Sequence, residues 1–415
     1  MGEDVTNSEI IGSASSTGAD LVTDTLIRLG CRHVFNITGL GMHSLAASLY
    51  RRRAEIGYLS HVNETNLALM AQGYARQTRS PAFCFVYNAS GTALALMSLT
   101  TAWADHAPLV LVTSSNSRTT TGRDQYAGIP RSAIEMGTQY TKWSYEVSIP
   151  ERLPETLARA AAIAAEPPMG PVHISIPADL YDAPVTGAIP RANFGQTRYF
   201  ADGCADEAGL AEIAKLLTAA ELPVLLAGSE VGQLQAVEPL IELAELLGAP
   251  VLMEDLPSYL SFPTSHAQYV GGLRANEKLL ADASAALAIG VEFTETGAGE
   301  EKPYLPPSVP LAALSVDPFH PTKQLWPAIA ISGHPRSSVR RLTELVSQAG
   351  VAADVHGRRL AVCAELRGQR ERKVEAVRAL DGDTSPVPAG KLIDEIRRAC
   401  GQDWTIVQVG STAGY

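Results

Sequence analysis

The chain has 415 residues, enough for two or three domains that each bury a hydrophobic core. Its 33 Lys and Arg residues face 44 Asp and Glu residues, which gives a formal charge of −11. Because no run of basic residues stands out, this balance argues against nucleic acid as a partner. No apolar segment reaches the roughly 18 residues of a membrane span.

Cysteine and histidine spacing indicates neither disulfides nor a metal site. The five cysteines are far apart, odd in number and never arranged as Cys-x-x-Cys, which is typical of reduced thiols. The nine histidines form no His-x-x-x-His or His/Cys cluster. Residues 1–18 lack the basic and apolar regions of a signal peptide, so we expect a short disordered lead. These features predict a cytoplasmic protein without nucleic acid or membrane partners.

Between residues 19 and 184, helical patterns alternate with short apolar runs. This alternation predicts an α/β domain with a doubly wound parallel sheet. The runs are nearly continuous in Val, Leu, Ile and Phe, as in strands buried on both faces. The expected strands are 34–37, 82–87, 109–113 and 172–176, and the expected helices are 19–29, 42–52, 64–77, 92–103 and 151–165.

A second unit of the same kind follows a linker at residues 185–203, which is rich in Pro, Gly and polar residues. This second domain, residues 204–380, should be Rossmann-like. Its expected strands are 223–227, 250–253, 285–289 and 311–316, with helices at 207–218 and 234–247 and a charged helical segment at 337–379.

Residues 381–415 predict the beginning of a third α/β unit. A turn-rich segment, 381–390, precedes a helix at 391–399 and a strand at 404–409. The third unit would therefore be truncated at residue 415. The expected fold class is α/β, with consecutive doubly wound parallel-sheet domains.

Glu64 occupies a position that calls for a chemical explanation. With Asn63 as the N-cap, it lies on the apolar stripe of the helix at 64–77. The other members of this stripe are Leu67, Ala68, Ala71 and Tyr74. A carboxyl there should be largely desolvated, which raises its pKa and lets it exchange a proton near neutral pH. Alternatively, a Glu in the first turn points to solvent and interacts favourably with the helix dipole.

Sequence strings on both sides of residue 150 then occur in the order of one known family. They are residues 73–76 (GYAR), 81–83 (PAF), 90–92 (SGT), 102–110 (AWADHAPLV), 142–146 (KWSYE), 170–177 (GPVHISIP), 290–293 (GVEF) and 314–318 (LSVDP). The chain thereby resembles the pyrimidine-binding and central domains of thiamine-diphosphate-dependent 2-oxo acid decarboxylases and carboligases. This is the acetolactate synthase and benzoylformate decarboxylase group.

The resemblance implies thiamine diphosphate and Mg²⁺ as cofactors, and it places Glu64 on the family's catalytic glutamate. A carboxyl group beside N1′ of the aminopyrimidine favours the tautomer that activates the cofactor for attack on a 2-oxo acid. The resemblance also assigns the loop at residues 36–41 to the pyrimidine and the substrate pocket. Thr38 and Gly39 would then contact the cofactor, and Leu40 would contact the substrate.

Residues 87–92 follow a predicted strand and open a helix, which is where open α/β sheets bind ligands. We predict Asn88 as a cofactor contact and Tyr87 as a substrate contact. A simple capping turn with Ser90 as the N-cap is compatible with both. Gln125 is the remaining candidate substrate contact.

Departures from the family pattern leave the 2-oxo acid open. Benzoylformate decarboxylase-like enzymes carry histidine at the position of Tyr87 and serine at that of Leu40. Acetolactate synthases carry a Phe-Gln-Glu string ahead of the Lys-Trp motif. This chain has residues 128–131 (GIPR) near that place, with Gln125 as the nearest glutamine.

The family's diphosphate-binding Gly-Asp-Gly motif does not occur in the sequence, and residues 382–384 (GDT) suit a turn. We therefore expect the metal and diphosphate ligands to lie outside this chain, in a homo- or hetero-oligomer with a diphosphate-domain chain. The alternative is a non-catalytic binding or regulatory subunit. In the second domain, Gly228, Gly271, Gly272 and Asp317 are either turn residues or part of a flavin or nucleotide site.

Overall fold

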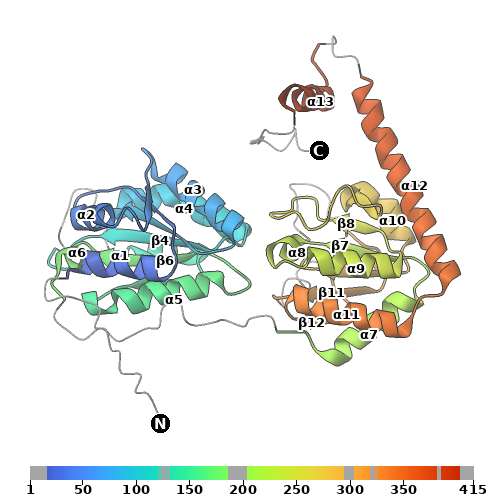
Figure 1. The fold of residues 1–415 in the computed structure, drawn as a ribbon, viewed down its shortest axis with the longest axis horizontal. Coiled ribbons are helices and arrows are strands. Elements are labelled where there is room, and N and C mark those ends of the chain that lie inside the picture. Colours follow the sequence, from blue (N-terminus) through green and yellow to red (C-terminus); the bar gives the residue numbers. More distant parts are fainter. Residues whose placement is uncertain are drawn as a thin grey trace. The chain divides into compact units, whose positions relative to one another are not determined.

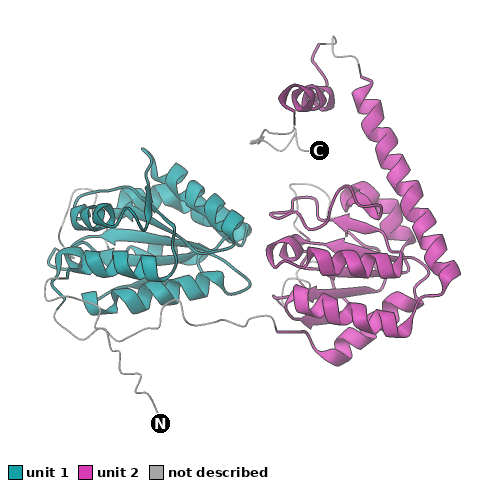
Figure 2. Cartoon of the chain, in the orientation of Figure 1, with its two compact units in different colours: residues 1–201 teal, residues 202–415 magenta. Residues whose placement is uncertain are grey.

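The computed structural model describes residues 16–120, 123, 128, 131–185, 203–293, 303–317, 322, 325–380 and 385–401. The chain divides into two compact units, residues 1–201 and 202–415 (Figure 2). The boundary falls within the segment predicted as a linker. No helix in the described part of the chain is both long and apolar enough to cross a membrane.

The first unit contains a six-stranded sheet in the order β2-β1-β3-β4-β6-β5, in which every pair is parallel. Its strands are β1 (His33–Asn36), β2 (Gly57–Leu59), β3 (Ala82–Tyr87), β4 (Leu109–Ser115), β5 (Trp143–Glu146) and β6 (Val172–Pro177). Its helices are α1 (Gly18–Arg28), α2 (His43–Arg51), α3 (Glu64–Thr78), α4 (Asn88–Ala104), α5 (Leu153–Ala165) and α6 (Asp179–Asp182), with 3-10 turns at Ile134–Met136, Thr138–Tyr140 and Pro150–Arg152 (Figure 1).

Alternating strand residues supply two cores, one on each face of this sheet. On β3, Phe83 and Phe85 pack with α1, α2, α5 and α6, whereas Cys84 and Val86 pack with α3 and α4. This is the two-residue period of a strand that is buried on both faces. It confirms the doubly wound arrangement that the apolar runs predicted.

Residues 16–18, which fall within the predicted lead, are ordered parts of the first unit. Thr17 caps α1 in a capping box with Asp20, and the backbone N–H of Val185 donates to the carbonyl of Ser16 at 3.0 Å. Both hydrogen bonds fix backbone that the composition alone suggested would be disordered.

The second unit repeats the architecture with the strand order β12-β11-β10-β7-β8-β9, again parallel throughout. Its strands are β7 (Pro223–Ala227), β8 (Val251–Met253), β9 (Tyr269–Gly272), β10 (Ala285–Ile289), β11 (Leu311–Ser315) and β12 (Ile329–Ser332). Its helices are α7 (Glu207–Ala219), α8 (Ser229–Gln233), α9 (Val237–Leu247), α10 (Glu277–Asp282), α11 (Pro335–Ala349), α12 (Ala353–Arg378) and α13 (Ala389–Cys400), with a 3-10 turn at Arg274–Asn276.

The charged helical segment predicted at 337–379 consists of two helices, which are separated where Gly350 adopts a φ of +75° between α11 and α12. The first half of α12 is attached to the second unit by Arg359, which is only 1% exposed. Its guanidinium donates to carbonyl oxygens at the ends of both α7 and α9, including Leu247 at 2.7 Å and Glu221 at 3.2 Å. A buried cation thus joins two helix C-termini.

Helix α13 confirms the helix expected at residues 391–399. The strand expected at 404–409 and the turn at 382–384 lie outside the described residues.

Candidate functional site

The carboxyl ends of β1, β2 and β3 lie side by side at one edge of the first sheet, because the three strands are parallel neighbours. From β1 the chain continues to β2 on one side of β1. From β2 it then crosses to β3, which lies on the other side of β1. Open α/β sheets bind ligands outside such a switch point. This edge carries Thr38, Gly39 and Leu40 after β1, Glu64 after β2, and Tyr87 and Asn88 at the end of β3. Gln125 lies outside the described residues.

Glu64 is the first residue of α3, directly after its N-cap. The side chain of Asn63 accepts a hydrogen bond from the backbone N–H of Asn66 at 3.2 Å, as predicted. Glu64 itself is partly buried within this chain, between the fully buried and the exposed residues of α3. The first turn of α3 packs on one side only, and Val62 just before it is 98% exposed.

The carboxyl of Glu64 lies close to the start of α4. A Cβ atom at Gly91 would stand 3.3 Å from Glu64 Oε1, which is a tight contact. The hydroxyl of Thr65 donates to the carbonyl of Leu94 at 2.7 Å and ties the two helices together. Burial, and to a smaller extent the charge of Glu64, raises the pKa of the Cys84 thiol on β3. Glu64 therefore stands over the end of the sheet.

Gly39 brings the loop after β1 against the ring of Tyr87. A Cβ atom at position 39 would stand 2.2 Å from Cγ of Tyr87, a separation that real side chains do not adopt. The close approach of backbone to ring therefore requires glycine here. This contact holds the loop after β1 against the end of β3. A ligand at this edge could therefore touch both segments.

A small polar cluster, which the sequence analysis missed, supports the same loop. The side-chain amide of Asn36 donates to Thr38 Oγ1 at 3.0 Å and to the Tyr58 hydroxyl at 2.8 Å. Thr38 and Tyr58 are themselves 2.9 Å apart. Tyr58 belongs to β2, a strand that the apolar pattern did not predict. The only sequence signal for this cluster was therefore Asn36, a polar residue at the end of a predicted strand.

Asn88 has a strained backbone and a free acceptor. Its φ is +50°, in the left-handed region that asparagine tolerates better than most residues. The residue is 3% exposed, and its Oδ1 has no hydrogen-bond partner within the described residues. Helix α4 begins at Asn88, so Ser90 lies in its first turn and the prediction of Ser90 as the N-cap is wrong. Strain and an unsatisfied buried acceptor together are features of binding sites.

A buried chain of hydrogen bonds runs from the core to Asn88. Thr92 Oγ1 donates to the carbonyl of Asn88 at 2.7 Å, and it lies 2.7 Å from Thr113 Oγ1. Thr113 in turn lies 2.8 Å from Nε2 of His173 on β6. Burial lowers the pKa of His173 to about 4, so the imidazole is neutral at pH 7.

Several large apolar side chains around Glu64 are exposed. Leu40 is 74% exposed, Leu94 is 44% exposed and Met97 is 57% exposed, in addition to Val62. We call these four side chains the apolar rim. Single exposed apolar residues are common, but several of them on the segments that carry or adjoin the site residues indicate a contact surface.

The corresponding edge of the second sheet is filled by the protein's own groups. A Cβ atom at Gly228 would stand 1.9 Å from the carbonyl oxygen of Gly290, so the ends of β7 and β10 meet backbone to backbone. The carboxylate of Glu230 accepts from Ser315 Oγ at 2.6 Å and from the backbone N–H of Val316 at 3.0 Å. These contacts favour the structural role over nucleotide binding for Gly228.

The three other candidates in the second unit also occupy turns or strand ends. Gly271 has a φ of +127° in β9, and Gly272 ends that strand. The backbone N–H of Asp317 donates to Ser315 Oγ at 3.0 Å. In the described residues of the chain, no group of three or more His, Cys, Asp or Glu side chains is placed to hold a metal ion.

Two family models match the chain. Residues 16–136 match the N-terminal thiamine pyrophosphate-binding domain of thiamine pyrophosphate enzymes, and residues 210–342 match the central domain of the same enzymes. The parallel sheets and these two matches together identify an α/β protein of the thiamine pyrophosphate enzyme class. The chain belongs to the thiamine pyrophosphate enzyme family.

Individual relatives agree with this family but differ in what they act on. The chain is 31% identical over 371 residues to a probable 2-ketoarginine decarboxylase of Pseudomonas aeruginosa, covering 85% of this chain and 62% of the relative. It is 30% identical over 268 residues to a benzoylformate decarboxylase of the same organism, covering 63% and 50%. A putative thiamin diphosphate-dependent enzyme from Mycobacterium smegmatis has a similar structure, with a TM-score of 0.72, 30% identity, and coverage of 80% and 63%. The chain thus spans between half and two thirds of the length of these proteins.

Proposed function

We propose that this chain takes part in the thiamine-diphosphate-dependent decarboxylation of a 2-oxo acid. The observation that carries the proposal is the grouping of Glu64, Gly39 and Asn88 at the switch point of the first sheet. Family membership supports the cofactor, and the relatives support the class of substrate. The identity of the 2-oxo acid differs among these relatives.

The residues at this edge fit an aminopyrimidine ring. Gly39 lets the loop after β1 pack directly on the Tyr87 ring at the end of β3, because no side chain projects from that position. The unpartnered Oδ1 of Asn88 would accept a hydrogen bond from a ring amino group. Thr38, held by Asn36 and Tyr58, would fix the loop against the ring. Glu64 would donate a proton to a ring nitrogen.

When bound, thiamine diphosphate supplies a carbon nucleophile and an electron sink for decarboxylation. Glu64 contributes one positioned proton on a carboxyl oxygen, the kind of general acid and base catalysis that typically gives 10²–10⁴-fold in rate. We assign Leu40, Tyr87 and Gln125 to the substrate side of the site. Of these, Leu40 is exposed and Tyr87 packs on Gly39.

A second domain or chain should cover this edge. Glu64 is only partly buried and the apolar rim is exposed, so a covering surface would bury apolar area and also desolvate the carboxyl further. We propose that this covering surface carries the Mg²⁺ and diphosphate ligands and belongs to a diphosphate-binding domain within a homo- or hetero-oligomer.

Substitution of Met97 tests the covering surface. In the presence of a diphosphate-domain chain, Met97→Asp should reduce association measured by sedimentation velocity at least tenfold, since it places a charge on a desolvated apolar contact. Val374→Asp is a matched control, because Val374 is similarly exposed but lies on α12. Equal association of both variants would contradict the proposed surface.

Release of CO₂ tests the function. The complex should be assayed with thiamine diphosphate, Mg²⁺ and three 2-oxo acids: pyruvate, benzoylformate and 2-ketoarginine. We expect turnover of at least one, and a loss of about 10²–10⁴-fold with Glu64→Gln. Analysis of products for a new carbon–carbon bond separates carboligation from simple decarboxylation. No turnover with any acid would favour a binding or regulatory subunit, and full activity of Glu64→Gln would rule out its proton role.

A further inference from the structure

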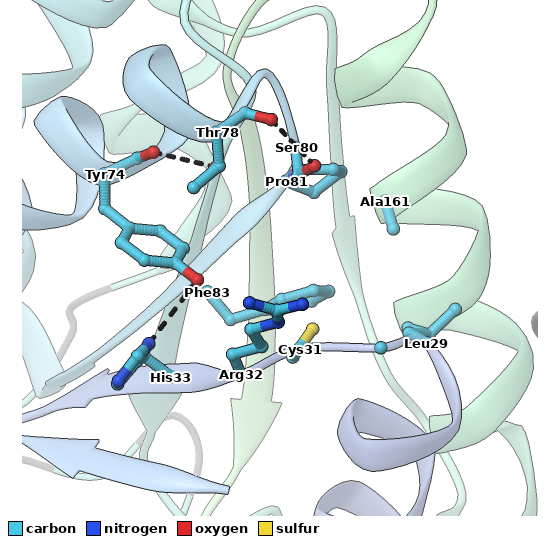
Figure 3. A pocket seen from close by; sticks show the side chains of 11 residues that line it. Leu29, Cys31, Arg32, His33, Tyr74, Thr78, Ser80, Pro81, Phe83 and Ala161 are labelled. Atoms are coloured by element: carbon cyan, nitrogen blue, oxygen red, sulfur yellow. Dashed lines mark hydrogen bonds between the residues drawn. The ribbon is translucent and has the colours of Figure 1, made fainter.

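A second cavity lies at the edge of the first sheet opposite to Glu64. Its volume is about 470 Å³, within the roughly 300–1,000 Å³ of small-molecule sites. The cavity is lined by the turn after α1, the residues around the start of β1, the end of α3, the start of β3 and one residue of α5 (Figure 3). Helix α3 extends over 15 residues from Glu64 to this cavity, roughly 21 Å at 1.5 Å per residue. The two sites are therefore separate.

The lining has an apolar part and a polar part. Phe83 of β3, Pro81 and Ala161 of α5 form the apolar part. On the polar part, the hydroxyl of Tyr74 lies 3.4 Å from Nδ1 of His33 (Figure 3). An apolar surface with a few convergent polar groups is the usual composition of a small-molecule site.

Arg32, just before β1, is an exposed residue that contributes a positive charge to this lining. Its side chain extends toward the cavity (Figure 3), and within the described part of the chain no carboxylate pairs with its guanidinium. The protein has 44 acidic against 33 basic residues, and nearby arginines use them: Arg28 pairs with Asp24, and Arg51 pairs with Asp20. What distinguishes Arg32 is its place in the lining of a cavity beside apolar side chains, where a guanidinium can pair with the carboxylate of a ligand.

A cationic ligand fits this cavity less well. Helices α1 and α3 both end here, and helix C-termini attract cations. One carbonyl near each of these ends already accepts a hydrogen bond, however: Leu26 accepts from the backbone N–H of Cys31 at 3.0 Å, and Ala75 accepts from that of Ser80 at 3.3 Å. The positive charge of Arg32 would also repel a cation. In addition, burial raises the pKa of Cys31 to about 12, so the sulfur gives no negative charge.

We propose that this cavity binds a small organic carboxylate with an apolar body. The carboxylate would pair with the guanidinium of Arg32, with the hydroxyl of Tyr74 as a second donor, and the apolar body would pack on Phe83 and Pro81. This site is independent of the proposed decarboxylation, since it contains none of the residues assigned to the cofactor or the substrate.

Binding of benzoate to the whole chain, measured by isothermal titration calorimetry, tests this proposal. Benzoate presents a carboxylate on an apolar ring, and benzyl alcohol presents a similar ring without the charge. We expect saturable binding of benzoate and at least tenfold weaker binding of benzyl alcohol. Absence of saturable benzoate binding up to about 10 mM, or equal binding of the two compounds, would overturn the proposal.

Three variants locate the binding. Arg32→Met removes the charge, and Ala161→Phe fills the cavity while leaving the charge in place. Each should weaken benzoate binding at least tenfold. The matched control is Arg53→Met, because Arg53 stacks on Tyr50 outside the cavity and should not affect binding. Thermal unfolding of each variant checks that it is folded.

Glu64→Gln separates this site from the β1–β3 edge. Benzoate affinity should be unchanged in Glu64→Gln if the ligand occupies the cavity beside Arg32. Affinity that depends on Glu64 and not on Arg32 or Ala161 would place the ligand at the candidate cofactor site and refute the second site. Because binding is measured directly, the result does not depend on whether the chain is catalytically active.

Discussion

Replacing the buried Arg359 by methionine should destabilise the second unit more than replacing an exposed arginine of α12. Arg359 is 1% exposed and donates to carbonyls at the ends of α7 and α9, so it joins three helices. Burial lowers the pKa of its guanidinium, yet an arginine remains protonated in proteins at neutral pH. Methionine retains an unbranched chain but provides no donor.

The magnitude follows from the carbonyls that the substitution leaves without a partner. The carbonyl oxygens of Leu247 and Ala220 both face the buried guanidinium. A buried polar group without a partner costs about 1–3 kcal/mol. The desolvation of the arginine, which the variant no longer requires, offsets part of this. We therefore expect a loss of about 3 kcal/mol in the free energy of unfolding of this unit.

Hydrogen–deuterium exchange measured by mass spectrometry is the suitable assay, because a chain of two units need not unfold in one step. About 3 kcal/mol corresponds to roughly a hundredfold faster exchange in peptides from α7 and α9. The control is Arg358→Met, since Arg358 is exposed and pairs with Glu221 and Asp354 at the surface, where ion pairs contribute little. If exchange in α7 and α9 were the same in the two variants, the role assigned to Arg359 would be refuted.

Two further predictions concern the first unit. Gly39→Ala should weaken thiamine diphosphate binding to the diphosphate-domain complex at least tenfold, measured by calorimetry, because the added Cβ would displace the Tyr87 ring. The control is Gly73→Ala on the exposed face of α3. This substitution should stabilise the unit by about 0.5–1 kcal/mol. Burial lowers the pKa of His173 from 6.5 to about 4, so the imidazole is neutral in the folded chain at pH 7. Between these two pH values the unfolded chain binds more protons than the folded chain. The free energy of unfolding therefore falls as the pH falls, by about 2 kcal/mol between pH 6.5 and 5. Chemical unfolding at pH 7 and 5 should show this loss in the wild type but not in His173→Gln, and an equal loss in both would contradict it.

The central strands could be predicted from the sequence, whereas the edge strands could not. Strands 82–87, 223–227 and 285–289 are continuous apolar runs, and their predicted bounds match the structure. The four missed strands, β2, β5, β9 and β12, are the two outer strands of each sheet. An edge strand pairs on one side and is partly exposed, so it needs no continuous apolar run and gives little periodic signal.

The site was predictable as a set of loops but not as a set of contacts. Parallel strands bring Thr38, Glu64 and Asn88 to one edge, which follows from topology once the strands are identified. The sequence gives no indication that Gly39 meets Tyr87 across the switch point, because that contact depends on the exact path of two loops. Helical periodicity identified the face of α3 that carries Glu64, but it does not show how completely another surface covers that face.

Motif strings alone do not separate structural from functional residues. Lys142 lies in one of the strings that indicated the family, yet its Nζ donates to the carbonyls of Ile163 at 2.5 Å and Glu166 at 2.6 Å. It therefore secures the end of α5. The Trp143 ring next to it stacks on Tyr145, with a centroid separation of 5.3 Å. The string is thus explained by packing and helix capping.

Exchange of the C2 proton of thiamine diphosphate tests the central claim most directly, because it reports the proton role of Glu64 without requiring the correct 2-oxo acid. The complex of this chain with a diphosphate-domain chain should be mixed with the cofactor and Mg²⁺ in deuterated water, and the exchange rate followed by quenched-flow NMR. We predict that the wild type exchanges this proton about 10²–10⁴-fold faster than Glu64→Gln. Equal rates in the two proteins, with thiamine diphosphate bound to both, would contradict the assignment of Glu64 as the residue that activates the cofactor.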